Sequence, residues 1–225
     1  MIKAIVTDIE GTTSSLAFVK EVLFPYARKH IQEFIRDNAT RNDVAKLLND
    51  VRSEVGRELD IEAVGAQLIE WIDEDKKVTP LKALQGLIWE AGYLNGDFHG
   101  HVYDDVVHKL REWHGWGIKL YVYSSGSVHS QKLLFSHTTH GDLTPLFSGY
   151  FDTNIGHKRD SASYATIHRQ LGFSPSEILF LSDVKEELDA ARDVGMRTCW
   201  LVRDGLVQTN AEHTQVASFE QILLQ

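Results

Sequence analysis

The sequence predicts the α/β fold class, a core built on a parallel sheet with an inserted all-helical domain. Three observations predict it. Four short runs rich in apolar and β-branched residues have the length of strands, and helical patterns separate the last three of them. A stretch of about 80 residues with helical periodicity and no strand-like run lies between the first run and the second.

The four expected strands are continuously apolar, as is typical of parallel strands that are covered on both faces. They span residues 2–7, 118–123, 178–181 and 198–202. Helical patterns occupy 127–137, 161–171 and 185–194, and the last two of these stop at Gly172 and Gly195, where glycine suits a helix end. Alternation of strands and helices predicts right-handed crossovers within one sheet.

The inserted domain is expected over residues 16–96, which leaves 1–15 and 97–225 as the core. Two apolar series in it repeat at helical spacing. The first comprises Val44, Leu47, Leu48, Val51 and Val55, and the second Leu81, Leu84, Leu87, Ile88 and Ala91. For the second helix we expect Thr79 as the N-cap, Pro80 at the first helical position and Gly92 as the stop.

The amino-acid composition limits the binding partners and the cellular location that can be expected for this protein. Hydrophobic residues make up 43% of the chain and charged residues 24%, as in soluble globular proteins. Lys and Arg number 23 against 32 Asp and Glu, a net charge of −9, so nucleic acid and anionic membranes are poor partners. The lone cysteine, Cys199, favours a reducing, cytoplasmic location. No apolar run approaches the roughly 18 residues of a membrane span, and no apolar stripe is left over, so a monomer is expected.

Polar clusters follow three of the four expected strands. Asp8-Ile9-Glu10-Gly11-Thr12 ends the first, Ser124-Ser125-Gly126-Ser127 the second, and Ser182-Asp183, with Glu187 close behind, the third. Lys158 precedes the helix that leads into the third strand. Because ligands of open parallel sheets bind outside the carboxyl ends of the strands, we expect these clusters to meet at one edge.

Together these groups suit a phosphate ester. Asp8 and Asp183 can share Mg²⁺, which prefers carboxylate, water and phosphate oxygens. Gly11 permits a sharp turn after Asp8, Ser124 and the amides behind it can contact phosphate oxygens, and Lys158 adds positive charge. A carboxylate then remains free to attack phosphorus and form an aspartyl-phosphate.

Each group alone also has a purely structural interpretation. Asp8 can be a turn residue, Lys158 a solvated surface lysine, and Asp183 with Glu187 an acidic helix start. Their shared position at strand ends favours catalysis instead. The pairs His99–His101 and His137–His140 suggest a transition-metal site as an alternative, but no cysteine cluster or acidic third ligand accompanies them.

This arrangement resembles the haloacid dehalogenase superfamily along the whole chain. The first motif of that superfamily is usually Asp-x-Asp-Gly-Thr, and residues 8–12 match it except that Glu10 replaces the second Asp. Ser124 matches the second motif, Lys158 the third, and Asp183 with Glu187 the acidic fourth. The resemblance implies a Rossmann-like core, with residues 16–96 as its helical cap.

Glu10 and several longer strings are similar to one family within that superfamily, the enolase-phosphatases, or acireductone synthases, of methionine salvage. The strings occupy residues 8–13, 18–19, 23–26, 85–89, 100–103, 123–127, 131–135, 151–153 and 155–158. The family converts 2,3-diketo-5-methylthiopentyl-1-phosphate to the acireductone 1,2-dihydroxy-3-keto-5-methylthiopentene and phosphate. It does so by enolisation followed by Mg²⁺-dependent dephosphorylation.

The resemblance also implies roles for individual residues. They are Asp8 as nucleophile and metal ligand; Glu10 as acid/base and metal group, through its carboxylate or its backbone carbonyl; Asp183 as metal ligand; Ser124, Ser125 and Lys158 as substrate-binding residues; and Gly11, Thr12, Gly126 and Glu187 as supporting residues. One Mg²⁺ per subunit is expected. The enolisation base is either Glu10 or a cap residue. Phe18, Trp89 and Tyr93 either select the methylthio chain or form the core of the cap.

Three rival functions share much of this pattern. A broad sugar-phosphate or nucleotide phosphatase would have the same core motifs, and only the cap and the longer strings disfavour it. A dehalogenase needs neither Glu10 nor magnesium. A catalytically inactive scaffold would not need Asp8, Glu10, Ser124, Lys158 and Asp183 together.

Overall fold

The computed structural model describes residues 1–208 and 211–224. It divides the chain into two units, one formed by Met1–Leu16 with His99–Gln225 and the other by Ala17–Phe98. The first unit contains the sheet and the second is all-helical. An all-helical insertion between the first and second strands, as the sequence predicts, is therefore present.

The first unit is a parallel six-stranded sheet with the order β3-β2-β1-β4-β5-β6. Its strands are β1 (Ala4–Thr7), β2 (Lys119–Tyr123), β3 (Phe147–Phe151), β4 (Ile178–Ser182), β5 (Arg197–Leu201) and β6 (Thr214–Val216). The four predicted strands are confirmed as β1, β2, β4 and β5. The strands β3 and β6 were not predicted, because Phe147–Phe151 contains Ser148 and Gly149 and β6 is only three residues long.

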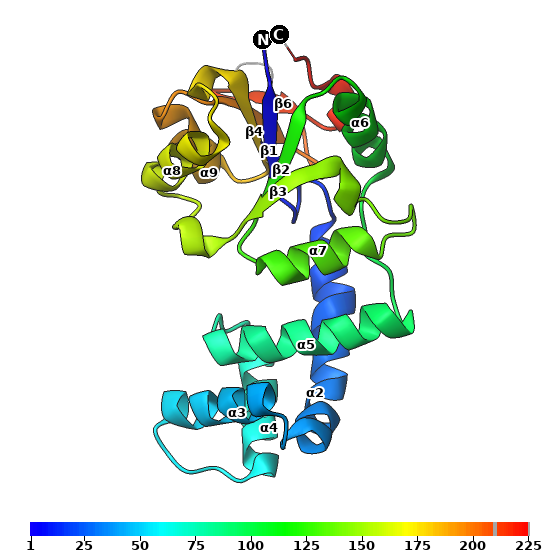
Figure 1. Cartoon of the computed structure of the whole chain (residues 1–225), viewed down its shortest axis with the longest axis vertical. Coiled ribbons are helices and arrows are strands. Elements are labelled where there is room, and N and C mark those ends of the chain that lie inside the picture. The colour runs from blue at the N-terminus through cyan, green and yellow to red at the C-terminus, as the bar shows by residue number, and fades with distance from the viewer. Residues whose placement is uncertain (209–210, 225) are drawn as a thin grey trace. The chain divides into compact units, whose positions relative to one another are not determined.

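Helices cover both faces of this sheet. They are α6 (Asp104–Gly115), α7 (Val128–Ser136), α8 (Ser161–Leu171) and α9 (Lys185–Asp193). Figure 1 shows α8 and α9 on one side of the sheet and α6 on the other. Successive β1 side chains alternate between these sides: Ala4 and Val6 pack in one buried cluster with Tyr164 and Leu188 from α8 and α9. Because both faces are covered, β1 and β4 are buried along their whole length.

The predicted helix ends of the core are largely confirmed. Gly172 caps α8 in the left-handed conformation, with φ +72°. Ser127 caps α7, since its side chain accepts a hydrogen bond from the Ser130 N–H (3.2 Å). Cys199 is buried in β5, and burial raises the pKa of its thiol to about 12. None of the described helices is both long enough and apolar enough to cross a membrane.

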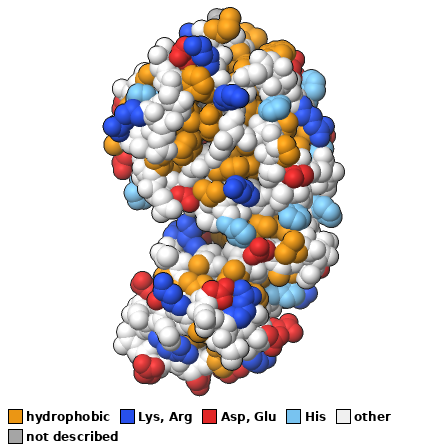
Figure 2. Space-filling view, in the orientation of Figure 1, with side chains coloured by type: hydrophobic (Ala, Val, Ile, Leu, Met, Phe, Trp, Pro, Cys, Tyr) orange, Lys and Arg blue, Asp and Glu red, His pale blue; other side chains and the backbone are white. Residues whose placement is uncertain are grey.

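The helical unit begins with α1 (Leu16–Phe18) and a π-helical turn (Val19–Leu23), followed by α2 (Phe24–Asn38), α3 (Asn42–Val55), α4 (Ile61–Asp73) and α5 (Thr79–Asn95). The two predicted apolar series form part of its buried core, with Val44, Leu48 and Leu84 among the most enclosed residues. On the face seen in Figure 2, Lys and Arg alternate with Asp and Glu over this unit.

Two predicted helix boundaries in this unit are wrong. Helix α5 starts at Thr79 with Val78 as its N-cap, so Pro80 is the second helical residue. The helix also continues through Gly92 and stops at Gly96, which has φ +75°. Gly92 has a packing role instead, because a Cβ there would lie 2.4 Å from the Phe98 ring.

The aromatic residues suggested for substrate selection lie in the packing of the helical unit. Phe18 and Tyr93 are buried, and both rings contact Phe98. Trp89 stacks on Phe24 and donates its indole N–H to the Leu23 carbonyl (2.8 Å). These contacts favour the interpretation that the three side chains form the core of this unit.

Candidate active site

Four predicted site residues lie at the carboxyl edge of the sheet. Asp8 follows β1, Ser124 follows β2 and Asp183 follows β4. Lys158 lies in the connection between β3 and α8. The parallel register of the sheet therefore gathers residues from distant parts of the chain.

Lys158 joins two carboxylates in a buried ion cluster. Its ammonium pairs with Oδ1 of Asp8 and, at 2.7 Å, with Oε2 of Glu187. The three side chains are 7–10% exposed, so each charge depends on the others for compensation. Burial alone would lower the pKa of Lys158, but the charges of Asp8 and Glu187 outweigh burial and raise it. Lys158 is thus a fixed cation beside Asp8.

Glu187 is held from both sides. Besides Lys158, its Oε2 accepts a hydrogen bond from the Ser182 hydroxyl (2.9 Å), and Ser182 Oγ in turn accepts the Val184 N–H (3.1 Å). Burial, followed by the charge of Asp8, raises the pKa of Glu187. The contacts make Glu187 the second anchor of the Lys158 ammonium.

The backbone around Lys158 is fixed by two buried tyrosines. The Tyr164 hydroxyl donates to the Lys158 carbonyl (2.7 Å), and the Tyr123 hydroxyl donates to the Gly156 carbonyl (3.0 Å). Tyr164 comes from α8 and Tyr123 from the end of β2, and both rings belong to the core of the unit. The lysine therefore extends from a loop that the core itself positions.

A tight turn follows Asp8. The N–H groups of Thr13 and Ser14 both donate to the Ile9 carbonyl (2.9 and 2.8 Å), and Gly11 has φ +77°. The Thr12 hydroxyl donates to Oδ2 of Asp8 at 3.4 Å. Both oxygens of Asp8 are thus contacted, one by Lys158 and one by Thr12. Glu10 is half-buried, and its backbone pairs with Ser14 in an isolated β-bridge.

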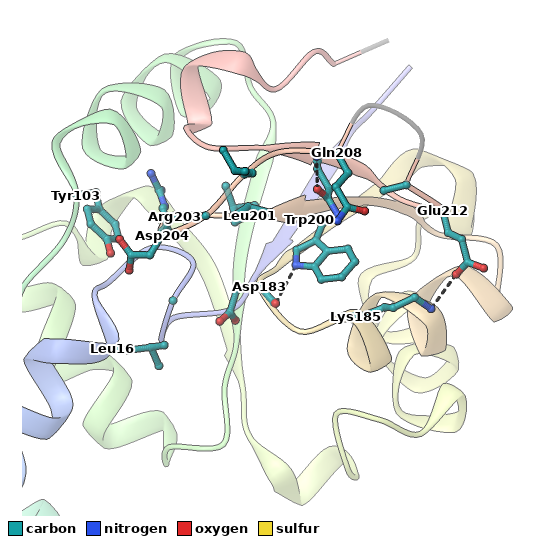
Figure 3. A pocket seen from close by; sticks show the side chains of 16 residues that line it. Leu16, Tyr103, Asp183, Lys185, Trp200, Leu201, Arg203, Asp204, Gln208 and Glu212 are labelled. Carbon is teal, nitrogen blue, oxygen red and sulfur yellow. Dashed lines mark hydrogen bonds and ion pairs between the residues drawn. The ribbon is translucent and has the colours of Figure 1, made fainter.

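Asp183 lies against this turn. A Cβ added to Gly11 would lie 2.2 Å from Oδ2 of Asp183, so any other residue there would displace this carboxylate. Burial, with a further contribution from the charge of Asp8, raises the pKa of Asp183 to about 7. The Trp200 indole N–H donates to the Asp183 backbone carbonyl (2.9 Å), as Figure 3 shows. This bond fixes the backbone, and the carboxylate remains available for a ligand.

The donor set around Asp183 fits a divalent cation. Its Oδ1 is buried and has no hydrogen-bond partner, and a nearby carboxylate, Asp8, opposes its ionisation. A buried carboxylate oxygen without a hydrogen bond is costly, so Oδ1 of Asp183 requires a partner. A hard cation such as Mg²⁺ would fill this role and would also neutralise the repulsion between the carboxylates of Asp183 and Asp8. Among the described residues no three Asp, Glu, His or Cys side chains converge as a metal cluster, so the carboxylates of Asp8, Glu10 and Asp183 do not form a ready-made triad.

The loop after β2 is organised around Ser124. Ser124 is buried, its N–H donates to the Phe151 carbonyl (3.2 Å), and its hydroxyl oxygen accepts the Gly126 N–H (3.2 Å). Gln131 holds the same loop by donating to the Gly126 carbonyl (2.8 Å). Ser125 is exposed. The loop leads directly into α7, so its N–H groups lie at a helix start, where anions are favoured.

A cavity of about 720 Å³ adjoins this edge in the first unit (Figure 3). Gly11 and Asp183 line it together with Tyr103, Trp200 and Arg203. Lys185 and Glu212 lie at the other end of the view and form an ion pair (2.8 Å).

Sequence reasoning missed three of the residues that position the site, namely Tyr164, Trp200 and Arg203. Each acts on a backbone carbonyl, of Lys158, Asp183 and Thr12 respectively. A carbonyl is present at every residue, so a bond to one leaves no pattern in the sequence. Only the position of Arg203 directly after a strand was a weak signal.

The histidine pairs have local partners. The Ser15 N–H donates to Nδ1 of His101 (3.0 Å), and His140 pairs with Asp104 (3.2 Å). In the part of the chain that the structure describes, no histidine belongs to a group that could hold a metal.

Comparisons with known proteins show which family the chain belongs to. The model of the haloacid dehalogenase-like hydrolases matches residues 2–195. Enolase-phosphatase E1 of Methylococcus capsulatus is 60% identical, over 99% of this chain and 98% of its own, and that of Pseudomonas aeruginosa is 56% identical, over 100% and 99%. Among solved structures, the UTR4 protein of Saccharomyces cerevisiae has a TM-score of 0.83 at 33% identity and covers 99% of this chain and 100% of its own.

Proposed function

The chain belongs to the haloacid dehalogenase-like hydrolases and, among them, to the enolase-phosphatases, and we infer that it catalyses the enolase-phosphatase reaction of methionine salvage. Its substrate is then 2,3-diketo-5-methylthiopentyl-1-phosphate. Its products are the acireductone 1,2-dihydroxy-3-keto-5-methylthiopentene and phosphate. The buried Asp8–Lys158–Glu187 cluster carries the phosphatase half of this proposal, because it holds a carboxylate and a cation at one sheet edge.

Asp8 is the proposed nucleophile. One of its carboxylate oxygens attacks phosphorus while the bond from phosphorus to the enol oxygen of the substrate breaks, which leaves an aspartyl-phosphate. Lys158 stabilises the negative charge that develops on the transferring phosphoryl group. Ser124 and the N–H groups at the start of α7 orient the phosphoryl oxygens, and the exposed Ser125 is placed to contact the substrate.

Glu10 is the proposed acid and base of the second step. It lies two residues from Asp8, so its carboxyl can give a proton to the leaving enol oxygen. The resulting carboxylate then takes a proton from water, whose oxygen attacks phosphorus, releases phosphate and restores Asp8. Thr12, Gly11 and Gly126 support this chemistry by shaping the two loops, and Glu187 by holding Lys158.

Asp8 and Asp183 would hold one Mg²⁺ per subunit through carboxylate oxygens, since Asp183 offers a buried oxygen that has no other partner. Among the residues that the structure describes, no three acidic side chains converge, so the backbone carbonyl of Glu10 suits the third position better than its carboxylate. When bound, the metal would neutralise charge on the phosphoryl group during transfer. Enolisation comes first, because removing a proton beside the carbonyl makes the enol oxygen a better leaving group than an alkoxide.

The proposal includes a small phosphate ester as the partner, a monomeric state and a cytoplasmic location. The single, buried Cys199 supports that location, because its thiol is shielded and cannot form a disulfide within the chain.

A coupled assay tests the function. The diketo phosphate is supplied with and without Mg²⁺, ultraviolet absorbance follows enol and acireductone, and a phosphate assay follows release. An absorbance change together with Mg²⁺-dependent phosphate release is expected. Phosphate release from a panel of ordinary sugar phosphates and nucleotides, without an enol signal, would instead identify a broad phosphatase of the same fold.

A further inference from the structure

Arg203 is a buried arginine that binds the turn after Asp8. It follows β5, and its side chain is 9% exposed. Its Nε and Nη2 both donate to the Thr12 carbonyl (3.0 and 2.8 Å), while Nη1 donates to Oδ2 of Asp105 (2.7 Å). One guanidinium thus joins the catalytic turn to the start of α6.

The surroundings of Arg203 are built to hold it in this one position. Its guanidinium carbon lies 4.2 Å from the centre of the Tyr103 ring and 5.2 Å from that of Phe219. Asp105 is itself fixed, since the same Oδ2 accepts the Ser218 hydroxyl (2.8 Å) and the Phe219 N–H (2.7 Å). Stacking on aromatic rings and the planar fork of donors are properties of arginine that lysine does not share.

The carbonyl that Arg203 holds belongs to a residue with two further roles. The Thr12 hydroxyl donates to Oδ2 of Asp8, and Thr12 directly follows Gly11, whose Cα lies against the Asp183 carboxylate. A shift of the Thr12 peptide would therefore move the proposed nucleophile and the proposed metal ligand relative to each other. In catalysis, displacements of about 1 Å can cost about a hundredfold in rate.

Arg203 lines the cavity beside Asp183, but its nitrogen atoms are engaged by the protein rather than directed to a ligand. Each of its three nitrogen atoms already donates to the protein, to Thr12, to Asp105 or, at 3.4 Å, to the Ala217 carbonyl. Figure 3 shows it beside Tyr103, to one side of the labelled Asp183 carboxylate. The contacts of Arg203 connect it to the proposed site through the turn after Asp8.

We propose that Arg203 is a positioning residue for the phosphoryl transfer, which fixes the Thr12 peptide and through it the alignment of Asp8 with Asp183. The inference rests on the proposed function, since it assigns Arg203 to the dephosphorylation step. It predicts an effect on kcat and on Mg²⁺ affinity, with little effect on KM.

The test compares Arg203→Lys and Arg203→Met with the wild-type protein. We expect kcat for phosphate release to fall about tenfold in Arg203→Lys and about a hundredfold in Arg203→Met, with KM and the inhibition constant of inorganic phosphate changed less than about threefold. Calorimetric titration with Mg²⁺ should show weaker binding to Arg203→Met. Thermal unfolding fixes an assay temperature at which each variant is folded, and the lysine variant keeps the test valid if the methionine variant does not fold.

Arg192→Met is the matched control. Arg192 also pairs with an acid, Asp189 (2.7 Å), but it is 44% exposed and contacts neither the turn nor Asp105. It should keep wild-type kcat and Mg²⁺ affinity. A rise in KM at unchanged kcat, or loss of activity only in proportion to the unfolded fraction, would overturn the inference. A wild-type protein without turnover would contradict the proposed function, and the inference would then be decided by Mg²⁺ affinity alone.

Discussion

Gly11 and Asp183 are in contact across the sheet edge, because a Cβ atom on residue 11 would lie only 2.2 Å from Oδ2 of Asp183. The Asp183 carboxylate therefore occupies the space that a side chain on residue 11 would need. The φ of +77° at Gly11 also disfavours any other residue.

Gly11→Ala should reduce phosphate release by about a hundredfold or more, because the Cβ must displace the Asp183 carboxylate. The positive φ should add a cost of roughly 1–2 kcal/mol in the free energy of unfolding. Steady-state kinetics and thermal unfolding measure the two effects. Gly172→Ala is the control: Gly172 has φ +72° with nothing near a Cβ, so it should lose stability and keep its kcat. Equal kcat values for the two variants would refute the importance of the contact.

Asp8→Asn should abolish phosphate release while enolisation continues, because only the second step needs a nucleophile. We expect kcat for release to fall by at least roughly a thousandfold, since the nucleophile is lost. The enol phosphate should accumulate, as followed by ultraviolet absorbance beside a phosphate assay. The exposed Asp160, changed to Asn, serves as the control. Loss of both signals in Asp8→Asn would show that the two steps share this carboxylate.

Removal of divalent metal by chelation should stop phosphate release, and added Mg²⁺ should restore it. Mg²⁺ should also stabilise the wild-type protein, by about 2.7 kcal/mol at a hundred times its dissociation constant. In Asp183→Asn most of this stabilisation should be lost, since the buried, unpartnered oxygen would no longer carry charge. Thermal unfolding across a Mg²⁺ series provides the measurement. An undiminished Mg²⁺ response in the variant would exclude Asp183 as a ligand.

The stability of the core unit should depend on pH through Asp105. Burial alone would raise the pKa of this carboxyl, but hydrogen bonds from Arg203, the Phe219 N–H and the Ser218 hydroxyl outweigh burial and lower it. A lowered folded pKa means that the stabilisation is present above the ordinary Asp pKa of about 3.9 and is lost as the pH falls through the folded value.

Asp105→Asn should accordingly be less stable than the wild-type protein by roughly 1–2 kcal/mol at pH 7, because charge-assisted hydrogen bonds are lost. The difference should shrink as the pH falls from about 4 through the lowered pKa of the folded carboxyl, because the unfolded wild-type protein takes up the proton first. Urea unfolding at pH 7 and below pH 4 measures this difference in the free energy of unfolding. Glu220→Gln, which breaks an exposed pair with His108, should show little change at either pH. A difference for Asp105→Asn that does not vary with pH would contradict this account.

The parts of the fold that sequence reasoning predicted are those with a repeating pattern. Strand β1 and the residues behind it were recognised because continuous apolarity marks a covered parallel strand and polar residues at its carboxyl end mark a site. That rule placed Asp8 and Lys158 on one edge although they are 150 residues apart in the chain. Their direct ion pair is a detail that no pattern contains.

The features that sequence reasoning failed to predict have physical causes. Strand β3 is at the edge of the sheet and only partly buried, so Ser148 and Gly149 are tolerated and the apolar run is broken. Gly92 was interpreted as a helix stop, but its missing side chain makes room for Phe98. A glycine needed for close packing and a glycine needed for a left-handed turn look the same in a sequence.

The strand order has a consequence for how the protein is made. β1 is synthesised first, yet it lies between β2 and β4, so both of its neighbours are translated much later. At about 5–20 residues per second, the ribosome needs on the order of ten seconds to reach the end of β4. During that interval the helical unit Ala17–Phe98 emerges with an apolar core of its own. Asp8 therefore leaves the ribosome well before the strands that pair with β1, so a prematurely terminated chain would carry Asp8 without a working site.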